Sequence, residues 1–120
     1  MRDDRQVLGA AGEAFAARWY EAAGYEVVDR NWRCREGELD LVVARGNEIV
    51  FCEVKTRRGL AFGAPAEAVT VTKQKRIRVL AMRWLAEHAD RRARDLRFDV
   101  ASVLAVRGTA PVIEVIEAAF

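Results

Sequence analysis

Residues 37–55 read GELDLVVARGNEIVFCEVK, and this stretch determines how the chain folds. Its apolar and alternating segments predict one strand over residues 38–44 and a second over residues 48–55. The turn between them, residues 45–47, has a length that suits a β-hairpin. Residues 50–52 are apolar throughout, which is typical of a strand in the interior of a sheet. We therefore expect a hairpin whose second strand lies inside a larger sheet.

Patterns on either side of the hairpin predict the remaining elements. Apolar residues recur at helical spacing in two stretches, which predicts helices over residues 5–23 and 72–88. The apolar stripe of the first helix is expected to consist of Leu8, Ala11, Phe15, Trp19 and Ala22. That of the second is expected to consist of Ile77, Leu80, Ala81, Trp84 and Leu85. Further strands are expected over residues 25–32, 96–106 and 112–116, and a loop over residues 56–66.

The predicted order is α-β-β-β-α-β-β, which places the chain in the α/β class. A sheet needs cover on its faces, so we expect a helix on each face. The connection from the third strand through the second helix is long enough for a parallel crossover, and the sheet should therefore be mixed. The chain has 120 residues and no repeat or linker, so residues 1–120 are predicted to form a single domain.

The composition excludes several classes of protein. No apolar run approaches the roughly 20 residues of a membrane span, and the charged N-terminus leads into no signal-peptide segment. We therefore expect a cytoplasmic protein with no membrane partner. Cys34 and Cys52 fit no CxxC pattern, which favours two reduced thiols. His88 is the only histidine, so a zinc site or a serine-histidine triad finds no support.

The charge is distributed unevenly, although the net charge is only +2. Residues 73–97 contain nine basic and three acidic residues, whereas the last ten residues contain two acids and no base. This asymmetry suits a face that binds a polyanion. A solvated helix face would give the same pattern, and the sequence leaves both interpretations open.

Two carboxylates and a lysine are predicted to share one patch of the sheet. Residues two apart in a strand point to the same face, so Glu53 and Lys55 project together. Pairing in the hairpin brings Asp40 within a residue or two of Glu53. Hard oxygen ligands of this kind hold Mg²⁺ or Mn²⁺, and with a lysine they suit hydrolysis of a phosphodiester bond. Glu13 of the first helix and Glu38 are further candidate ligands.

The pair Glu53-x-Lys55 is by itself weak evidence for a catalytic site, because this spacing occurs by chance in many chains. Its alternative interpretation is a charge pair on a solvated face of the sheet. The context favours a site, since the pair ends the most apolar strand, an acid-bearing strand precedes it and a basic helix follows it. Asp99, on the fourth strand, is expected to make a structural hydrogen bond or ion pair rather than to support the site.

Several motifs in order carry a resemblance to a known family: Gly12-Glu13, residues 31–35, 37–42 and 51–57, Lys73-Gln74, and residues 97–100. In these motifs the chain resembles the YraN family of small bacterial proteins. The resemblance implies the restriction-endonuclease-like fold of the PD-(D/E)XK superfamily, which archaeal Holliday-junction resolvases share. It implies Asp40, Glu53, Lys55 and Glu13 as catalytic residues, the three carboxylates among them binding metal. Gln74 matches a helix glutamine of related nucleases, but Arg78 replaces the aromatic residue that usually follows it by four.

These expectations combine into a divalent-metal-dependent nuclease that hydrolyses phosphodiester bonds in DNA, with branched or repair intermediates as candidate substrates. The alternative is a non-catalytic module that keeps the fold and binds nucleic acid or another partner. Candidate nucleic-acid contacts are Arg33, Arg35, Arg57, Arg58, Lys73 and Arg76, which are otherwise ordinary solvated residues. Trp19 and Trp84 are expected to pack in the core. A symmetric branched substrate would favour a homodimer, which the sequence itself does not show.

Overall fold

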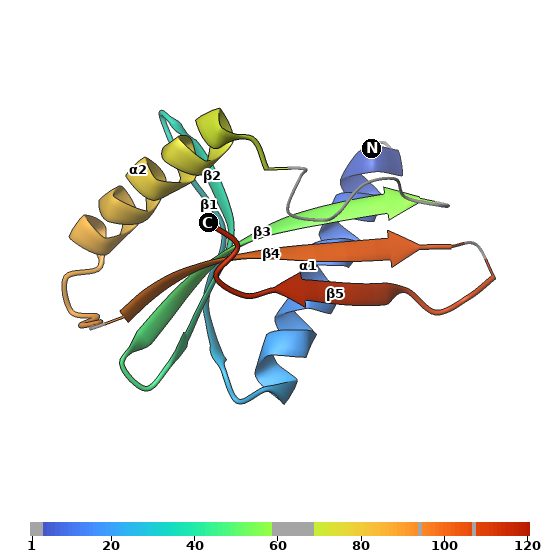
Figure 1. The fold of residues 1–120 in the computed structure, drawn as a ribbon, viewed down its shortest axis with the longest axis horizontal. Coiled ribbons are helices and arrows are strands. Elements are labelled where there is room, and N and C mark those ends of the chain that lie inside the picture. Colours follow the sequence, from blue (N-terminus) through green and yellow to red (C-terminus); the bar gives the residue numbers. More distant parts are fainter. Residues whose placement is uncertain (1–3, 59–68, 94, 107) are drawn as a thin grey trace.

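The computed structural model describes residues 4–58, 69–93, 95–106 and 108–120. Its elements, in chain order, are α1 (Asp4–Ala22), β1 (Glu26–Cys34), β2 (Gly37–Arg45), β3 (Glu48–Arg58), α2 (Val71–Glu87), β4 (Asp95–Ala105) and β5 (Val112–Ile116) (Figure 1). The predicted order α-β-β-β-α-β-β is confirmed. Most of the predicted loop over residues 56–66 lies outside the described residues. Neither helix in the described part of the chain is long and apolar enough to cross a membrane.

The five strands form one sheet in the order β1-β2-β3-β4-β5. Only β3 and β4 are parallel, because α2 connects them, and the other neighbours are antiparallel. The two helices cover opposite faces (Figure 1), and alternate residues of β2 pack toward each of them. Val42 belongs to the core under α2, whereas Leu41 and Val43 belong to the core under α1. The expected mixed sheet and restriction-endonuclease-like fold are thereby confirmed.

The predicted hairpin between β2 and β3 is confirmed, and its register is defined by the pair Arg45 and Glu48. Gly46 supplies the positive φ, 59°, that a two-residue hairpin turn favours at its first central position. The predicted end of β3 at Lys55 is wrong, because the strand continues to Arg58. Its last residues pair in parallel with β4, for example Thr56 with Val103. This pairing overrides the loop composition of the segment.

The predicted apolar stripe of α1 is wrong in part, although Trp19 packs against the core under α1 as expected. Ala11 and Ala22 are exposed, and the buried face consists of Gly12, Ala16, Ala17 and Tyr20. Small residues occupy this face because the helix lies very close to β3: a Cβ atom on Gly12 would lie 1.9 Å from Thr56 Oγ1. The close packing brings the adjacent residue, Glu13, toward the sheet.

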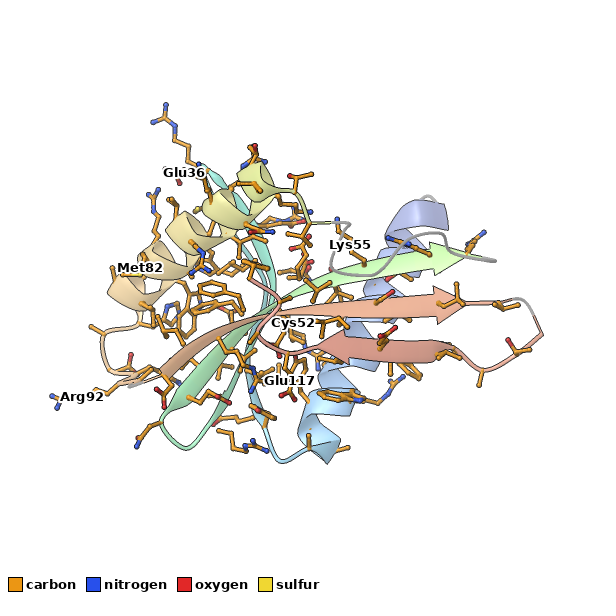
Figure 2. The ribbon with its side chains drawn as sticks, viewed as in Figure 1. Glu36, Cys52, Lys55, Met82, Arg92 and Glu117 are labelled. Atoms are coloured by element: carbon orange, nitrogen blue, oxygen red, sulfur yellow. The ribbon has the colours of Figure 1, made fainter. Side chains whose placement is uncertain are left out.

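The predicted apolar stripe of α2 is confirmed, with Ile77, Leu80, Ala81 and Trp84 buried. Thr70 caps the start of the helix, since its hydroxyl accepts a hydrogen bond from Lys73 N. Both cysteines are free thiols, as expected. Cys52 is buried in the interior of the fold (Figure 2).

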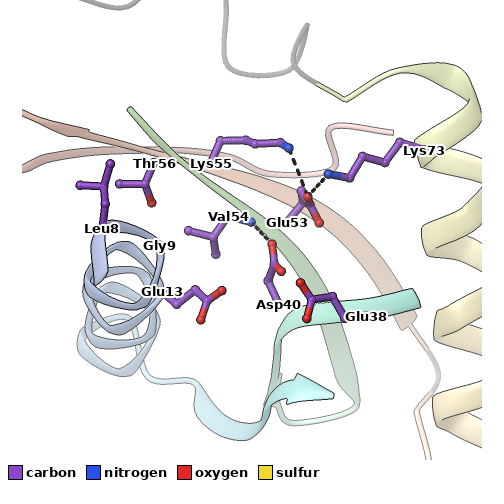
Figure 3. Close-up of a pocket in the computed structure, with 10 residues that line it drawn as sticks. All are labelled: Leu8, Gly9, Glu13, Glu38, Asp40, Glu53, Val54, Lys55, Thr56 and Lys73. Carbon is purple, nitrogen blue, oxygen red and sulfur yellow. Dashed lines mark hydrogen bonds and ion pairs between the residues drawn. The ribbon is translucent and has the colours of Figure 1, made fainter. Parts of the chain in front are cut away.

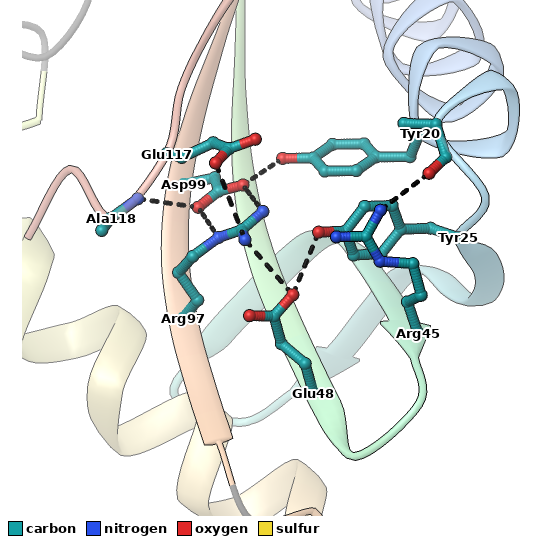
Figure 4. A network of polar contacts seen from close by, with 9 residues as sticks. Tyr20, Tyr25, Arg45, Glu48, Arg97, Asp99, Glu117 and Ala118 are labelled. Atoms are coloured by element: carbon teal, nitrogen blue, oxygen red, sulfur yellow. Dashed lines mark hydrogen bonds and ion pairs between the residues drawn. The ribbon is translucent and has the colours of Figure 1, made fainter.

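Asp99 is the centre of a buried polar network on β4 (Figure 4). Its carboxylate is completely buried and accepts hydrogen bonds from Tyr20 Oη at 2.6 Å and from Arg97 Nε at 2.8 Å and Nη2 at 2.9 Å. Ala118 N donates a further hydrogen bond at 3.0 Å. Burial raises the pKa of Tyr20, and the hydrogen bonds to Asp99 raise the pKa of Arg97. The expected structural role of Asp99 is confirmed, because the network joins β4 to α1 and to the C-terminus.

Candidate functional site

The candidate site lies where β2 and β3 stop pairing. The regular ladder between these strands ends at the pair Leu41 and Cys52. Asp40 and Glu53 are the next residues along the two strands, on the side away from the turn. Beyond that point, Asp40 Oδ2 accepts a hydrogen bond from Val54 N at 2.9 Å (Figure 3). A side-chain carboxylate thus binds a backbone N–H of β3 after the hairpin ladder has ended. The predicted proximity of Asp40 to Glu53 follows from this register.

A pocket of about 410 Å³ opens at this place. It is lined by Leu8, Gly9, Glu13, Glu38, Asp40, Glu53, Val54, Lys55, Thr56 and Lys73. A smaller pocket of about 240 Å³ shares Glu38, Asp40, Glu53 and Lys73 with it and extends along α2 to Arg76. The structure therefore brings together all four residues implied as catalytic, from α1, β2 and β3 (Figure 3).

Glu53 is the most buried carboxylate of the pocket, with 8% of its side chain exposed. Lys73 Nζ lies 2.5 Å and Lys55 Nζ 3.5 Å from the same oxygen, Glu53 Oε1. Burial lowers the pKa of Lys55, and the nearby Lys73 lowers it further. Burial, the largest single effect, would lower the pKa of Lys73, but the hydrogen bond to Glu53 together with the charges of Glu53 and Asp40 raises it. Glu53 is thus held by two ammonium groups, one from β3 and one from α2.

Two other carboxylates of the pocket, Asp40 and Glu13, resist ionisation. Burial, reinforced by the charge of Glu53, raises the pKa of Asp40 to about 7. Burial also raises the pKa of Glu13, and the charges of Glu38 and Glu53 add to this effect although a hydrogen bond with Asn31 opposes it. Like charges gathered in a partly buried pocket are typical of a functional site rather than of a stabilising surface cluster.

The donor atoms of this pocket match the preference of Mg²⁺ and Mn²⁺, because all are hard carboxylate oxygens. Within the described ranges, however, no three side chains of the His, Cys, Asp or Glu type converge closely enough to hold a metal ion as they stand. Lys73 Nζ, in addition, contacts one of the two carboxylate oxygens of Glu53. The residues fit such an ion in type, provided that the side chains around Glu53 reorient.

The other predicted nucleic-acid contacts are only partly gathered at the pocket. Arg76 lines the smaller pocket, and Arg33 pairs with the pocket residue Glu38 at 3.0 Å. Arg35 lies with Arg33 around a separate, shallow pocket near the β1–β2 turn. Arg57 and Arg58 are at the end of β3, beyond Lys55. The structure therefore places Lys73, Arg76 and Arg33 nearest to the carboxylates.

The basic stretch over residues 73–97 does not form one free face. Four of its arginines contact other side chains of the chain: Arg78 lies over the Phe98 ring, Arg83 pairs with Glu36, Arg91 with Glu26, and Arg97 with Asp99. Lys75, Arg76 and Arg92 are exposed, and Arg92 extends from the edge of the molecule (Figure 2). Arg94 lies outside the described residues. Of the exposed residues, Arg76 lies beside the pocket, and the polyanion-binding interpretation stays a prediction.

The sequence did not predict that Asn31 and Lys73 contact carboxylates of the site. Asn31, with a positive φ of 50°, hydrogen-bonds Glu13 from β1. Lys73 was expected to contact nucleic acid, yet it contacts Glu53. Its position in the first turn of a helix is a usable signal, because cations are unfavourable there. Gln74 donates to the Val69 carbonyl at 3.1 Å.

Comparison with known proteins identifies the family. Residues 12–103 match the model of the uncharacterised protein family UPF0102, and the chain belongs to this family, which is the expected YraN family. A UPF0102 protein of Nocardia farcinica is 57% identical, over 98% of this chain and 91% of its own length. A UPF0102 protein of Beutenbergia cavernae is 57% identical over 92% of both chains. A third, of Acidothermus cellulolyticus, is 45% identical over 97% of this chain and 95% of its own.

Proposed function

We propose that this UPF0102 protein is a divalent-metal-dependent nuclease that hydrolyses phosphodiester bonds in DNA. The observation that carries the proposal is the meeting of Asp40, Glu53, Lys55 and Glu13 in one pocket, at the point where β2 and β3 separate. Carboxylates that raise one another's pKa in a pocket are unfavourable for stability, and a cation that binds between them removes this cost. A pocket that only bound nucleic acid would gain nothing from carboxylates that repel phosphate.

Each residue has a defined part in the proposed chemistry. Asp40, Glu53 and Glu13 would hold Mg²⁺ or Mn²⁺. Such an ion would polarise the phosphate and favour formation of hydroxide from water at neutral pH. Lys55 shares the strand face of Glu53 and would orient the attacking water or stabilise the charge that develops on the phosphate. Its lowered pKa, caused by burial and by Lys73, suits exchange of a proton with that water.

The proposed substrate is recognised by shape rather than by base sequence. The basic residues near the pocket, Arg33, Lys73 and Arg76, suit phosphate contacts, which position a nucleic acid without reading its bases. Branched or repair intermediates are therefore the proposed substrates, and two-fold symmetric ones would be cut by a homodimer.

One sheet with both helices packed on it supports a single domain over residues 1–120.

The test is a cleavage panel in Mg²⁺ or Mn²⁺, with EDTA as the blank. The substrates are linear duplex, single-stranded, flapped and four-way-branched DNA. We expect metal-dependent cleavage that falls by about 100-fold or more in Asp40→Asn and in Lys55→Ala, because each loses a ligand or a charge that stabilises the reaction. Lys75→Ala, an exposed lysine of α2, is the matched control and should cleave as the wild type does. Equal cleavage by Lys55→Ala and Lys75→Ala would contradict the proposal.

A second candidate function is a binding module that keeps the fold but cleaves nothing. One observation favours it: Lys73 and Lys55 give Glu53 two charge partners in the absence of a metal ion. Such a module would bind DNA in a salt-sensitive manner that is independent of metal and of Glu53. Binding of this kind, with no cleavage of any substrate in the panel, would favour the module over the nuclease.

A further inference from the structure

Two lysines contact one oxygen of a buried carboxylate, whereas a simple ion pair requires only one ammonium group. Lys73 Nζ and Lys55 Nζ lie 2.5 Å and 3.5 Å from Glu53 Oε1. A buried carboxylate needs a partner, but Lys55 alone, from the same strand, would provide one. The second ammonium adds repulsion between the lysines. The presence of Lys73 is therefore not explained by the stability of Glu53 alone.

The position of Lys73 in its helix is itself unfavourable. It is the third residue of α2, and no acidic residue accompanies it in the first turn. The helix macrodipole places partial positive charge at this end, where cations are disfavoured. Lys75, two residues later, is exposed and forms no ion pair with a carboxylate among the described residues. The contact that Lys73 makes with Glu53 offsets this cost.

That contact occupies Glu53 Oε1, one of the two carboxylate oxygens that could bind a divalent cation. Glu53 lies in the wall of the pocket between Asp40 and the two lysines, and both lysines contact its Oε1 atom (Figure 3). An ammonium group and a metal ion cannot both take this oxygen, since their charges repel at contact distance. Lys73 also lines the smaller pocket, which leads along α2 to Arg76, three residues further on the helix. The side chain thus has a second polar environment that it can enter when it leaves Glu53.

We propose that Lys73 is the resident cation of the carboxylate cluster, that it yields Glu53 to a divalent cation, and that its released ammonium then binds a phosphate of the substrate beside Arg76. This inference rests on the proposed metal site. In the metal-free protein the pocket is negative and repels phosphate, while Lys73 is engaged. Once Lys73 is released, it adds positive charge to the pocket wall. Metal binding therefore precedes DNA binding, and Lys73 opposes the first step and assists the second.

The test compares Lys73→Met with Lys75→Met, the matched control on the same helix. Isothermal titration with Mn²⁺ alone should show Lys73→Met binding the ion about 10-fold more tightly than the wild type, because the competitor is removed. Fluorescence anisotropy with a short duplex in Ca²⁺ should show weaker DNA binding by Lys73→Met, with a salt slope smaller by about one. Lys75→Met should leave Mn²⁺ affinity unchanged. Lys73→Gln keeps a hydrogen-bond donor for Glu53 and serves as the second variant if Lys73→Met folds poorly.

The opposite signs of the two effects distinguish this role from a structural ion pair. Equal or weaker Mn²⁺ binding by both Lys73 variants, with the wild type binding the ion, would overturn the inference and leave the metal site intact. Absence of Mn²⁺ binding by the wild type and by both variants would overturn the metal site itself. Tighter Mn²⁺ binding together with weaker DNA binding supports the inference.

Discussion

At the scale of single residues, Asp40 has two conflicting roles, one as a hydrogen-bond acceptor and one as a buried charge. Its Oδ2 atom accepts the hydrogen bond from Val54 N at 2.9 Å, which joins β2 to β3 where their ladder has ended. Its negative charge, in contrast, is disfavoured by burial and by Glu53, which together raise its pKa to about 7. The hydrogen bond stabilises the fold, and the charge is useful only to a bound cation. Such a conflict is typical of residues retained for function.

The conflict predicts how stability depends on pH. Because the folded state raises the pKa of Asp40 above its unfolded value, the native state holds the proton more tightly. The contribution of Asp40 to stability is therefore greatest below its unfolded pKa and is lost as pH rises through about 7. Asp40→Asn stays neutral and keeps an oxygen for Val54 N, so in EDTA it should be more stable than the wild type at pH 8 by about 1–3 kcal/mol.

Urea unfolding at several pH values checks this prediction. The difference between wild type and Asp40→Asn should nearly vanish at pH 4 and should shrink at pH 8 when Mn²⁺ is added, because only the wild type gains from the ion. Asp90→Asn, an exposed carboxylate after α2, should show neither effect. A loss of stability in Asp40→Asn at pH 8 would contradict this account of the charge.

The sequence was sufficient to place Asp40 beside Glu53, because the alternation of 37–55 and a short turn define the register of a hairpin. It was not sufficient to predict the contact of Lys73 with Glu53. That contact depends on how the start of α2 packs beside β3, which no local sequence pattern determines. The hydrogen bond of Asn31 with Glu13 likewise joins β1 to α1, and sequence spacing carries no information on it.

At the scale of elements, the contact between α1 and β3 positions Glu13. Gly12 lies so close to Thr56 that a Cβ atom would come within 1.9 Å of the Thr56 hydroxyl. The buried Thr56 Oγ1 has no hydrogen-bond partner among the described residues, which shows that close packing takes precedence over polar contacts here. The apolar periodicity predicted the wrong face of α1, because the pattern gives weight to large residues and this interface uses small ones. The existence and limits of the helix were nevertheless predicted within a residue.

Gly12→Ala should destabilise the protein by about 1–3 kcal/mol, because the added methyl group overlaps Thr56 and β3 cannot move away from its partners on the sheet. Thr56→Ala in the same chain should restore part of this loss, since it removes the overlapping hydroxyl and methyl groups. Guanidinium unfolding of the two single variants and the double variant measures the coupling.

Gly9→Ala provides a matched control one turn earlier in α1, where a Cβ atom would meet no other atom within 4 Å. It should be neutral or stabilising by up to about 1 kcal/mol, as expected for alanine in a helix. Strictly additive effects of Gly12→Ala and Thr56→Ala would show that this contact does not set the distance between α1 and β3.

At the scale of the whole molecule, one sheet separates two apolar cores and gathers the carboxylates at one place between them. Each helix has its own core, and the pockets lie where α1, the ends of β2 and β3, and the start of α2 meet. The two cores keep this arrangement rigid, while the network around Asp99 fixes β4 against α1. The fold class and order of elements follow from periodicity alone. The site exists only after α1 and α2 have packed on the sheet.

The central claim is that this junction is a metal-dependent active site with Glu53 at its centre. The most direct measurement is cleavage of branched and linear DNA in Mn²⁺ by Glu53→Ala, beside the wild type and Glu114→Ala, an exposed glutamate of β5. Circular dichroism would first confirm that each variant is folded. The account predicts that Glu53→Ala loses cleavage by more than about 100-fold, whereas Glu114→Ala cleaves as the wild type does. Undiminished cleavage by folded Glu53→Ala would contradict the account.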